Sequence, residues 1–348
     1  MSRISNLMLR FENWPAEDQS RWQAAFKTGD RFDESGRGAH LEESTRKVWQ
    51  ESYARFLGFI TANLRNLLTL PPEARIDRKI VSEYVTWRRR SCGDMTVSID
   101  LDHLRGALKL MAPDSDWSWL LTITKRIAAT APRKAGKYHL VTSDRLYALG
   151  IDLMDSAVAD AEAAGHIRKA HAFQYRDGLV IALLALVPLR RRTLAALRVG
   201  RHLVKTGDLW SLDIPAADTK AGRALDYPIS RAMSERIDLY LEQFRGRIPG
   251  AHKHASLWAS NQGCPMCGMA IYAAVRRRTK KAFGFAVNLH RFRHAAASFW
   301  SSHDPVNVRG AKDLLGHASF DPTEKHYIMG QSRLAGRALA HAIDTLRK

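Results

Sequence analysis

The stretch NLHRFRHAAASFW, residues 288–300, places a histidine and an arginine where one helix face would present both. His290 and Arg293 stand at i and i+3, which makes them neighbours on a helix, and Asn288 is a suitable N-cap for that helix. An imidazole can move a proton near neutral pH, and a guanidinium group can bind two phosphate oxygens at once. The pair alone indicates little, because a chain with 14 histidines and 38 arginines is expected to contain about one such pair by chance.

A zinc site is the alternative for the same stretch, since His290 and His294 are spaced like the histidines of His-Glu-x-x-His metalloproteases. The residue after the first histidine is Arg291, where such a protease carries its glutamate base. Arg291 and Arg293 would also repel a divalent cation. We therefore predict no metal at this position.

Further stretches add polar groups in order along the chain. Each group has an ordinary explanation by itself, such as a solvated helix end, a turn lysine, a helix C-cap or a packed aromatic ring. Their order, spacing and predicted secondary structure favour a single site instead. The groups are Arg190 in ALVPLRRRTLAAL, Lys220 in DTKAGRALDYPIS, His317 in LLGHAS and Tyr327 in KHYIM.

Taken in order, these motifs resemble those of the tyrosine recombinase (phage integrase) family. ALVPLRRRTLAAL is similar to the family's apolar helix with Leu-Arg and a following Leu-x-x-Leu, DTKAGRALDYPIS to the hairpin around its lysine, and NLHRFRHAAAS to its His-x-x-Arg box. The resemblance to the catalytic domain covers about residues 165–330. It implies six active-site residues, which are Arg190, Lys220, His290, Arg293, His317 and Tyr327.

Two positions depart from the family pattern. Members usually carry an acidic residue three positions after the first arginine, where this chain has Thr193. In many members the tyrosine follows the Leu-Gly-His histidine by nine residues, but here His326 holds that place and Tyr327 comes tenth. Some members show a His-Tyr pair with the longer spacing, so we expect the Asp-Pro turn between His317 and Tyr327 to absorb the extra residue.

The resemblance implies a phosphoryl-transfer chemistry that these residue types suit. Arg190 and Arg293 would neutralise the charge that develops on the non-bridging oxygens of a DNA phosphodiester. Tyr327 would attack phosphorus, with His290 assisting the loss of its proton, because an ordinary tyrosine titrates near pH 10. Lys220, on a hairpin, is the predicted general acid for the leaving 5′ oxygen.

The same resemblance gives His317 the role of donating a hydrogen bond to a phosphate oxygen. The resulting 3′-phosphotyrosyl link keeps the bond energy, so a second DNA end can reverse the reaction without ATP. The one Gly-Lys of the chain, in AGKYH, lacks the Ser/Thr and the upstream glycine of a nucleotide-binding P-loop. We therefore predict an enzyme with no cofactor and no metal ion.

The charge balance favours a nucleic-acid partner. The chain of 348 residues carries 54 Lys+Arg against 35 Asp+Glu, a net charge of +19, and its basic residues lie in both halves. Three cysteines cannot build a disulfide framework, which indicates a reducing compartment. The N-terminus lacks the apolar core of a signal peptide, and LVIALLALVPL is too short to cross a bilayer. These features predict a cytoplasmic, DNA-associated protein that does not bind membranes.

Two basic clusters are predicted to contact phosphates, although a solvated helix end would look similar. They are Arg88, Arg89 and Arg90 in WRRR, and Arg276, Arg277, Arg278, Lys280 and Lys281 in RRRTKK. The motif CPMC holds Cys264 and Cys267 downstream of His252 and His254, which together offer four zinc ligands. The two histidines are only one residue apart, and a turn before a helix is the more ordinary explanation of this stretch.

The apolar pattern predicts a mainly helical chain with one small sheet. Residues 44–64 place Val48, Tyr53, Phe56, Leu57 and Ile60 on one stripe, with Ser44 as N-cap. Further helices are expected at 145–164, 173–187, 231–245 and 269–283. Trp210, Leu212 and Ile214 alternate along one strand, and Leu225, Tyr227 and Ile229 alternate along a second that pairs with it in an antiparallel hairpin.

The resemblance implies that these elements divide into the two domains of the fold that DNA breaking-rejoining enzymes share. We expect residues 1–38 to form an N-terminal extension, 39–132 an all-α core-binding (SAM-like) domain and 133–144 a linker rich in Pro, Gly and Lys/Arg. The catalytic domain is expected to take residues 145–330. Residues 331–348 are predicted to form a C-terminal helix suited to docking on a neighbouring protomer.

The predicted function is a site-specific recombinase or integrase that cleaves and rejoins duplex DNA, to integrate or excise a mobile element. It would act as a homotetramer on two recombination sites, with directionality or DNA-bending proteins as accessory partners. Xer-like resolution of replicon dimers and type IB topoisomerase activity use the same chemistry and stay open. A decayed recombinase that only binds DNA, and a metal-dependent nuclease or transposase, are alternatives of other classes.

Overall fold

The structure, a computed structural model, describes residues 7–132, 141–219, 222 and 224–303. The chain divides into two compact units, Met1–Lys137 and Tyr138–Lys348, each with its own hydrophobic core. Lys220, His317 and Tyr327 lie outside the described residues, as does the predicted C-terminal helix 331–348. Within the part that the structure describes, no helix has both the length and the apolar character that crossing a bilayer requires.

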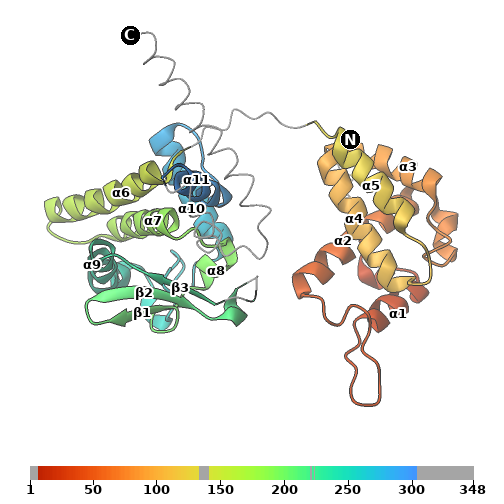
Figure 1. Ribbon diagram of the computed structural model, residues 1–348, viewed down its shortest axis with the longest axis horizontal. Coiled ribbons are helices and arrows are strands. Elements are labelled where there is room, and N and C mark those ends of the chain that lie inside the picture. Colours follow the sequence, from red (N-terminus) through yellow and green to blue (C-terminus); the bar gives the residue numbers. More distant parts are fainter. Residues whose placement is uncertain (1–6, 133–140, 220–221, 223, 304–348) are drawn as a thin grey trace, which may run out of the picture. The chain divides into compact units, whose positions relative to one another are not determined.

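The first unit is all-helical (Figure 1). Its core is rich in aromatic side chains that meet edge to face, such as Phe56 on Tyr84 with ring centroids 5.5 Å apart. Short 3₁₀ turns connect or precede the helices at Phe11–Asn13 and Arg65–Thr69. The helices are α1 Ala16–Ala25, α2 Glu43–Asn63, α3 Arg78–Arg89, α4 Asp94–Met111 and α5 Ser118–Thr130.

The predicted apolar stripe of α2 is mostly confirmed. Tyr53, Phe56, Leu57 and Ile60 are buried, but Val48 is 36% exposed, because it lies one turn before the part of the helix that enters the core. The predicted N-cap is wrong. The helix begins at Glu43 after Glu42, and Ser44 lies inside its first turn, where its hydroxyl donates to the Glu42 carboxylate at 3.3 Å.

Helix α1 contributes to the core of the first unit, although its sequence predicted only an extension. Trp14 and Trp22 are buried on either side of a fully buried carboxylate, Asp18. Asp18 accepts hydrogen bonds from the Tyr53 hydroxyl at 2.7 Å and from both terminal nitrogens of Arg75, at 2.5 and 3.2 Å. Residues 7–38 therefore belong structurally to the same unit as α2–α5.

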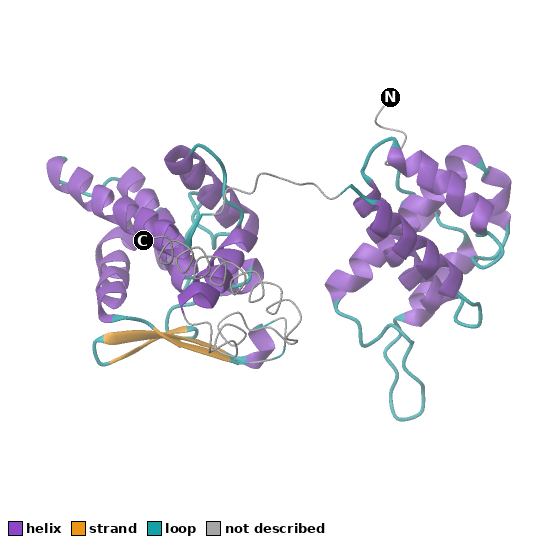
Figure 2. Cartoon of the chain, turned by 45° about the horizontal axis from the view of Figure 1, so that its top comes forward, coloured by secondary structure: helices purple, strands orange, loops and turns teal. Residues whose placement is uncertain are grey.

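The second unit packs helices against a small sheet. Helices α6 and α7 pair along their length, and α7 is buried around almost its whole circumference. Figure 2 shows the strands gathered along one edge of this unit, with helices over one side of them. Its elements are α6 Ser143–Ala163, α7 Lys169–Leu186, α8 Arg191–Ala196, β1 Leu203–Thr206, β2 Leu209–Ile214, β3 Leu225–Pro228, α9 Arg231–Leu239, α10 Gly268–Phe283 and α11 Leu289–His303.

The sheet is antiparallel in the order β1-β2-β3, with Leu212 opposite both Leu203 and Tyr227. Trp210, Leu212 and Ile214 face the core as predicted. Strand β1 was not predicted, because its Leu203–Thr206 stretch is too short to show alternation. The mainly α fold with a small antiparallel sheet is confirmed.

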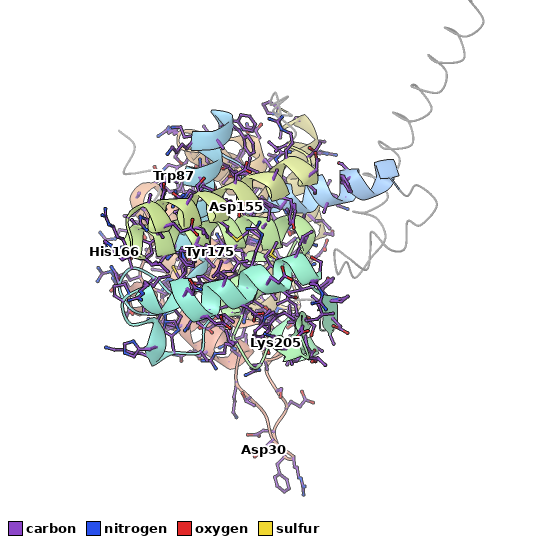
Figure 3. The ribbon with its side chains drawn as sticks, turned by 90° about the vertical axis from the view of Figure 1, so that its left-hand side faces the viewer. Asp30, Trp87, Asp155, His166, Tyr175 and Lys205 are labelled. Atoms are coloured by element: carbon purple, nitrogen blue, oxygen red, sulfur yellow. The ribbon has the colours of Figure 1, made fainter. Side chains whose placement is uncertain are left out.

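The predicted single helix 231–245 changes its winding partway. Helix α9 ends at Leu239, a π-turn follows over Tyr240–Phe244, and a 3₁₀ turn closes the segment at Arg245–Arg247. The π-turn brings two rings onto Tyr175 of α7, with Phe244 stacked at 4.3 Å and Tyr240 at 6.1 Å. Figure 3 labels Tyr175 within this unit. Stacking of rings from distant segments leaves no signal in the local pattern.

Candidate active site

A tight turn at the end of α7 sets the position of Arg190. Val187 caps the helix by donating to Leu183 at 2.7 Å, and Leu189 then donates back to the Val187 carbonyl at 2.7 Å across buried Pro188. Proline suits this turn because its ring fixes φ and it has no N–H to satisfy. Arg190 follows as the N-cap of α8, and its carbonyl accepts from Leu194 at 2.9 Å.

Arg293 reaches the same turn from α11. The helix begins directly after Asn288, whose side-chain oxygen accepts from the Tyr272 hydroxyl at 3.1 Å. Phe292 is fully buried and anchors this part of the helix. Arg293 is half-buried, and its guanidinium donates to the Pro188 carbonyl at 2.6 Å. The two predicted arginines therefore meet at one turn, although they are far apart in sequence.

Burial and a like charge act together on Arg293. Desolvation is the larger cause, and the positive charge of Arg190 adds to it, so that the pKa of Arg293 falls to about 10. Tyr227 of β3 acts in the opposite sense and raises the pKa of Arg293. The positive charge of Arg190 disfavours the charged form of Arg293, and a bound anion would relieve that cost. The geometry therefore suits a phosphate group.

His290 lies in the first turn of α11, on the exposed side of the helix. Partial burial lowers the pKa of His290, and the charges of Arg293 and Arg291 lower it further. Its ring meets His294 edge to face, with centroids 4.6 Å apart and planes at 88°. The neutral imidazole that results at physiological pH can accept a proton.

Helix α8 is held in place by contacts with the hydrophobic core. The indole nitrogen of buried Trp258 donates to the Leu194 carbonyl at 2.9 Å, and Leu194 itself is fully buried. Thr193, which stands where relatives usually carry an acid, is 6% exposed. A hydroxyl at this buried position contributes no negative charge beside the neighbouring arginines.

The hairpin that carries Lys220 is anchored on its first side. Asp218 ends a 3₁₀ turn, Ala216–Asp218, two residues before the lysine. Its carboxylate accepts from Arg201 at 2.7 Å and contacts the ring of His202 at 3.0 Å. The hydrogen bond with His202 is the largest cause that lowers the pKa of Asp218, and the bond from Arg201 lowers it further. The described end of the hairpin is thus held by a charged carboxylate.

The structure brings Arg190, His290 and Arg293 together, and it does not describe Lys220, His317 or Tyr327. The carbonyl of Pro188 is a contact that the sequence did not predict, since a backbone oxygen leaves no signal in side-chain patterns. Tyr227 was predicted only as a strand residue. Its effect on the pKa of Arg293 adds it to the neighbourhood of the site.

The first basic cluster does not present all of its arginines to solvent. Arg88 is 4% exposed and donates to Asp100, with its Nε at 2.9 Å. Arg89 pairs with Asp94 at 2.7 Å and remains half-exposed, while Arg90 is exposed. A buried, carboxylate-bound guanidinium cannot reach a phosphate, so we leave Arg88 out of the surface that we propose for DNA.

The second cluster is partly tied to a buried acid. Asp177 is 1% exposed and accepts from Arg277 at 3.1 Å, from Arg278 at 3.0 Å and from its neighbour Arg176 at 2.7 Å. This hub was not predicted, because its arginines come from two helices far apart in the chain. Arg276 is exposed and lies over the Tyr272 ring, and Lys280 and Lys281 are exposed.

The CPMC stretch forms the second side of a small hairpin. Ser260 donates its N–H to the Cys264 carbonyl at 2.8 Å, and Met266 donates to the Trp258 carbonyl at 2.9 Å. Cys267 is the N-cap of α10. Over the described ranges, no three His, Cys, Asp or Glu side chains gather closely enough to hold a metal ion.

Residues 159–332, half of the chain, match the phage integrase family. No curated protein matches the chain. Among solved structures, the chain is similar to a XerH site-specific recombinase bound to a palindromic difH substrate in a post-cleavage complex, with 15% identity, a TM-score of 0.56, and 84% of this chain and 78% of that one covered. A XerA recombinase aligns with 17% identity and a TM-score of 0.42 over 88% and 94% of the two chains.

The family match covers half of the chain and includes the candidate active site. The likeness to XerH extends the shared fold over most of the chain's length. The chain belongs to the phage integrase family, and it is a tyrosine recombinase.

Proposed function

We propose that this protein is a site-specific DNA recombinase that cleaves and rejoins duplex DNA through a 3′-phosphotyrosyl intermediate on Tyr327. The observation that carries the proposal is the meeting of Arg190 and Arg293 at the Pro188 turn, with the pKa of Arg293 lowered to about 10. A partly desolvated guanidinium beside a second positive charge favours the binding of an anion. A phosphodiester is the anion that a basic tyrosine recombinase would bring there.

In this mechanism the two arginines bind the non-bridging oxygens and stabilise the charge that develops on them. Tyr327 attacks phosphorus, the bond to the 5′ oxygen breaks, and Lys220 gives that oxygen its proton. His290, kept neutral by its lowered pKa, takes the proton of the tyrosine. His317 donates a hydrogen bond to the phosphate, and attack by a 5′ hydroxyl of a second strand reverses every step.

We propose integration or excision of a mobile element as the biological use, with the protein acting as a tetramer on two sites. The XerH recombinase is bound to a palindromic DNA substrate, which supports a duplex with two inverted half-sites as the partner here. The core-binding role of the first unit and docking of residues 331–348 on a neighbour belong to the same proposal. Exposed Arg89, Arg90, Arg276, Lys280 and Lys281 would contact phosphates.

A covalent-trapping experiment tests the chemistry. Selection from random duplexes would first supply a bound site, and a nicked version of that site then traps the cleaved intermediate. We expect a covalent protein–DNA adduct with wild type in EDTA, none with Tyr327→Phe, and an undiminished yield with the control Tyr147→Phe. An adduct that survives Tyr327→Phe would contradict the assignment and direct attention to His326.

Two measurements separate the remaining alternatives. A metal-dependent nuclease would lose its activity in EDTA and form no adduct. A topoisomerase would relax supercoiled DNA but would not join strands of two different duplexes, so a strand-exchange assay between two labelled sites distinguishes it from a recombinase. Products that contain strands of both duplexes are expected.

A further inference from the structure

A narrow arm leaves the first unit between α1 and α2. It runs from Lys27 to Gly36, and Figure 1 and Figure 3 show it extending from the body of its unit, with Asp30 near the end. Its base is closed by the Gly36 N–H, which donates to the Lys27 carbonyl at 2.9 Å. An ion pair between Lys27 and Asp33 at 3.0 Å ties its two sides.

Hydrogen bonds and close backbone contacts define the conformation of the arm. The Asp30 carboxylate accepts from the backbone N–H of Phe32 at 2.8 Å and of Asp33 at 3.1 Å, which fixes the turn at the tip. A Cβ atom on Gly29 would lie 2.3 Å from the Asp33 carbonyl oxygen, and one on Gly36 would lie 2.3 Å from the Ala24 carbonyl oxygen. Both sides of the arm therefore approach other backbone more closely than any residue but glycine allows.

The tip presents a phenyl ring to solvent. Phe32 is 95% exposed, whereas the next most exposed large apolar side chain in the described ranges, Met269, is 59% exposed. Single exposed apolar residues are common on protein surfaces. Phe32 differs from these because the ring adds nothing to the core, while several bonds and two glycines maintain the arm that carries it.

The charge of the tip indicates what it contacts. Residues 30–34 carry three acidic side chains and one basic side chain, 1 − 3 = −2, on a chain whose net charge is +19. An acidic tip is repelled by DNA phosphates and attracted to basic protein surfaces. A second copy of this chain is such a surface, and it is present whenever several copies assemble on DNA.

We propose that the Lys27–Gly36 arm is a self-association element, which docks Phe32 and its acidic neighbours on the basic surface of a second copy of this chain. Aromatic anchors surrounded by complementary charge are typical of the residues that dominate protein interfaces. The proposal rests on the assembly of several copies that the proposed function includes, and it does not depend on the chemistry of strand cleavage.

Photocrosslinking tests the contact in the full chain. The photoreactive residue p-benzoylphenylalanine would replace Phe32 in a mixture of isotopically light and heavy protein, with and without a duplex of mixed sequence. We expect a covalent dimer of the 39.2 kDa chain that contains mixed-isotope linkages to basic peptides. The same group at Met95, which is 53% exposed on α4, is the matched control and should give no dimer above background. Linkage within one chain only, or to DNA only, would overturn the proposal.

Two substitutions test how much Phe32 and the acidic charge contribute to self-association. Phe32→Ser removes the anchor, and Glu34→Lys reverses a charge while leaving the Asp30 turn and the Lys27–Asp33 pair in place. Each should weaken self-association in sedimentation experiments by about fivefold or more. Unchanged self-association, or a loss of affinity for a single DNA site in its place, would overturn the proposal.

The covalent-trapping assay keeps this proposal separate from the proposed function. Both arm variants should still form the phosphotyrosyl adduct on an isolated nicked site, since they touch no active-site group. If wild type itself formed no adduct, the proposed function would fail while the self-association result would stand.

Discussion

The two units of the molecule each desolvate an arginine, wholly in the first unit and partly in the second, and different groups surround the two side chains. In the first unit Arg75 is 1% exposed, and it bonds the carboxylate of Asp18, the Tyr53 hydroxyl and backbone carbonyls. In the second unit Arg293 donates to the Pro188 carbonyl, which carries no formal charge, and Arg190 adds a second positive charge nearby.

We interpret the difference as one between a charge that stabilises the fold and a charge that we propose for catalysis. Arg75 and Asp18 neutralise each other, so the core around them is complete without a ligand. Arg293 is partly desolvated beside a like charge, and its pKa is lowered because the protein around it opposes the charged form. Active sites often retain such costs, because the same field that destabilises the empty site stabilises the charge of the reacting group.

The largest expected effect comes from breaking the neutralised pair. Arg75→Met should lower the free energy of unfolding by about 3–5 kcal/mol, since it leaves the Asp18 carboxylate buried without its cation. Denaturant titration of the full chain, followed by tryptophan fluorescence, measures the loss. The surface control Arg105→Gln breaks the Arg105–Asp102 pair and should change stability by less than about 0.5 kcal/mol. Equal losses in both variants would contradict the structural role of the buried pair.

At the candidate active site we expect the opposite result, a large effect on activity and a small effect on stability. Arg293→Gln and Arg190→Gln should each slow formation of the covalent adduct by about 10²–10³-fold, because a donor to the developing charge is lost. Each should destabilise the fold much less than Arg75→Met does, since each removes one of two neighbouring like charges. Single-turnover trapping and thermal denaturation measure the two effects. An Arg293 variant as destabilised as Arg75→Met would show that Arg293 is structural.

An anion should bind at the pair formed by Arg190 and Arg293. Sulfate or phosphate well above its dissociation constant is expected to stabilise wild type by about 1–3 kcal/mol, through linkage to the folded state. The stabilisation should be lost in Arg293→Gln and kept in Arg75→Met. Thermal denaturation at constant ionic strength, with chloride as the reference anion, separates binding from general salt effects. The same shift in all three proteins would place the anion elsewhere.

The Pro188 turn should matter less than the arginines that it positions. Pro188→Gly keeps the carbonyl but frees the backbone, so Arg293 has a less fixed acceptor. We expect adduct formation to slow by roughly tenfold with affinity for DNA unchanged, an effect of position rather than of charge. A matched loss of affinity and rate would indicate that the turn serves binding.

The smallest expected effect concerns the pH profile. The folded pKa of His290 lies below its ordinary value, so the neutral imidazole should persist to lower pH than for a free histidine. Adduct formation should therefore decline only at a pH lower than that at which a free histidine takes up its proton. Stability linked to His290 is present above its unfolded pKa and is lost as pH falls through the folded pKa. In Arg293→Gln the decline should move to higher pH, because one cause of the lowered pKa is removed.

Much of the protein could be read locally from its sequence. The apolar period of α2, the alternation of β2 and the order of the motifs around Arg190, His290 and Arg293 each depend on neighbouring residues, and the fold and family they predicted are confirmed. The roles of Lys220, His317 and Tyr327 stay predictions, because these residues lie outside those that the structure describes.

Tertiary structure alone decided which charges are neutralised. Arg88 and Arg278 stand in runs of basic residues that predicted phosphate contacts, but each bonds a carboxylate that the fold brings to it, Asp100 and Asp177 respectively. Arg293, which its His-x-x-Arg motif assigned to the active site, donates to a neutral carbonyl and lies within electrostatic reach of a second arginine. A side chain's type fixes its charge. The distant partner that folding places beside it decides whether that charge is neutralised inside the protein or remains available to a substrate.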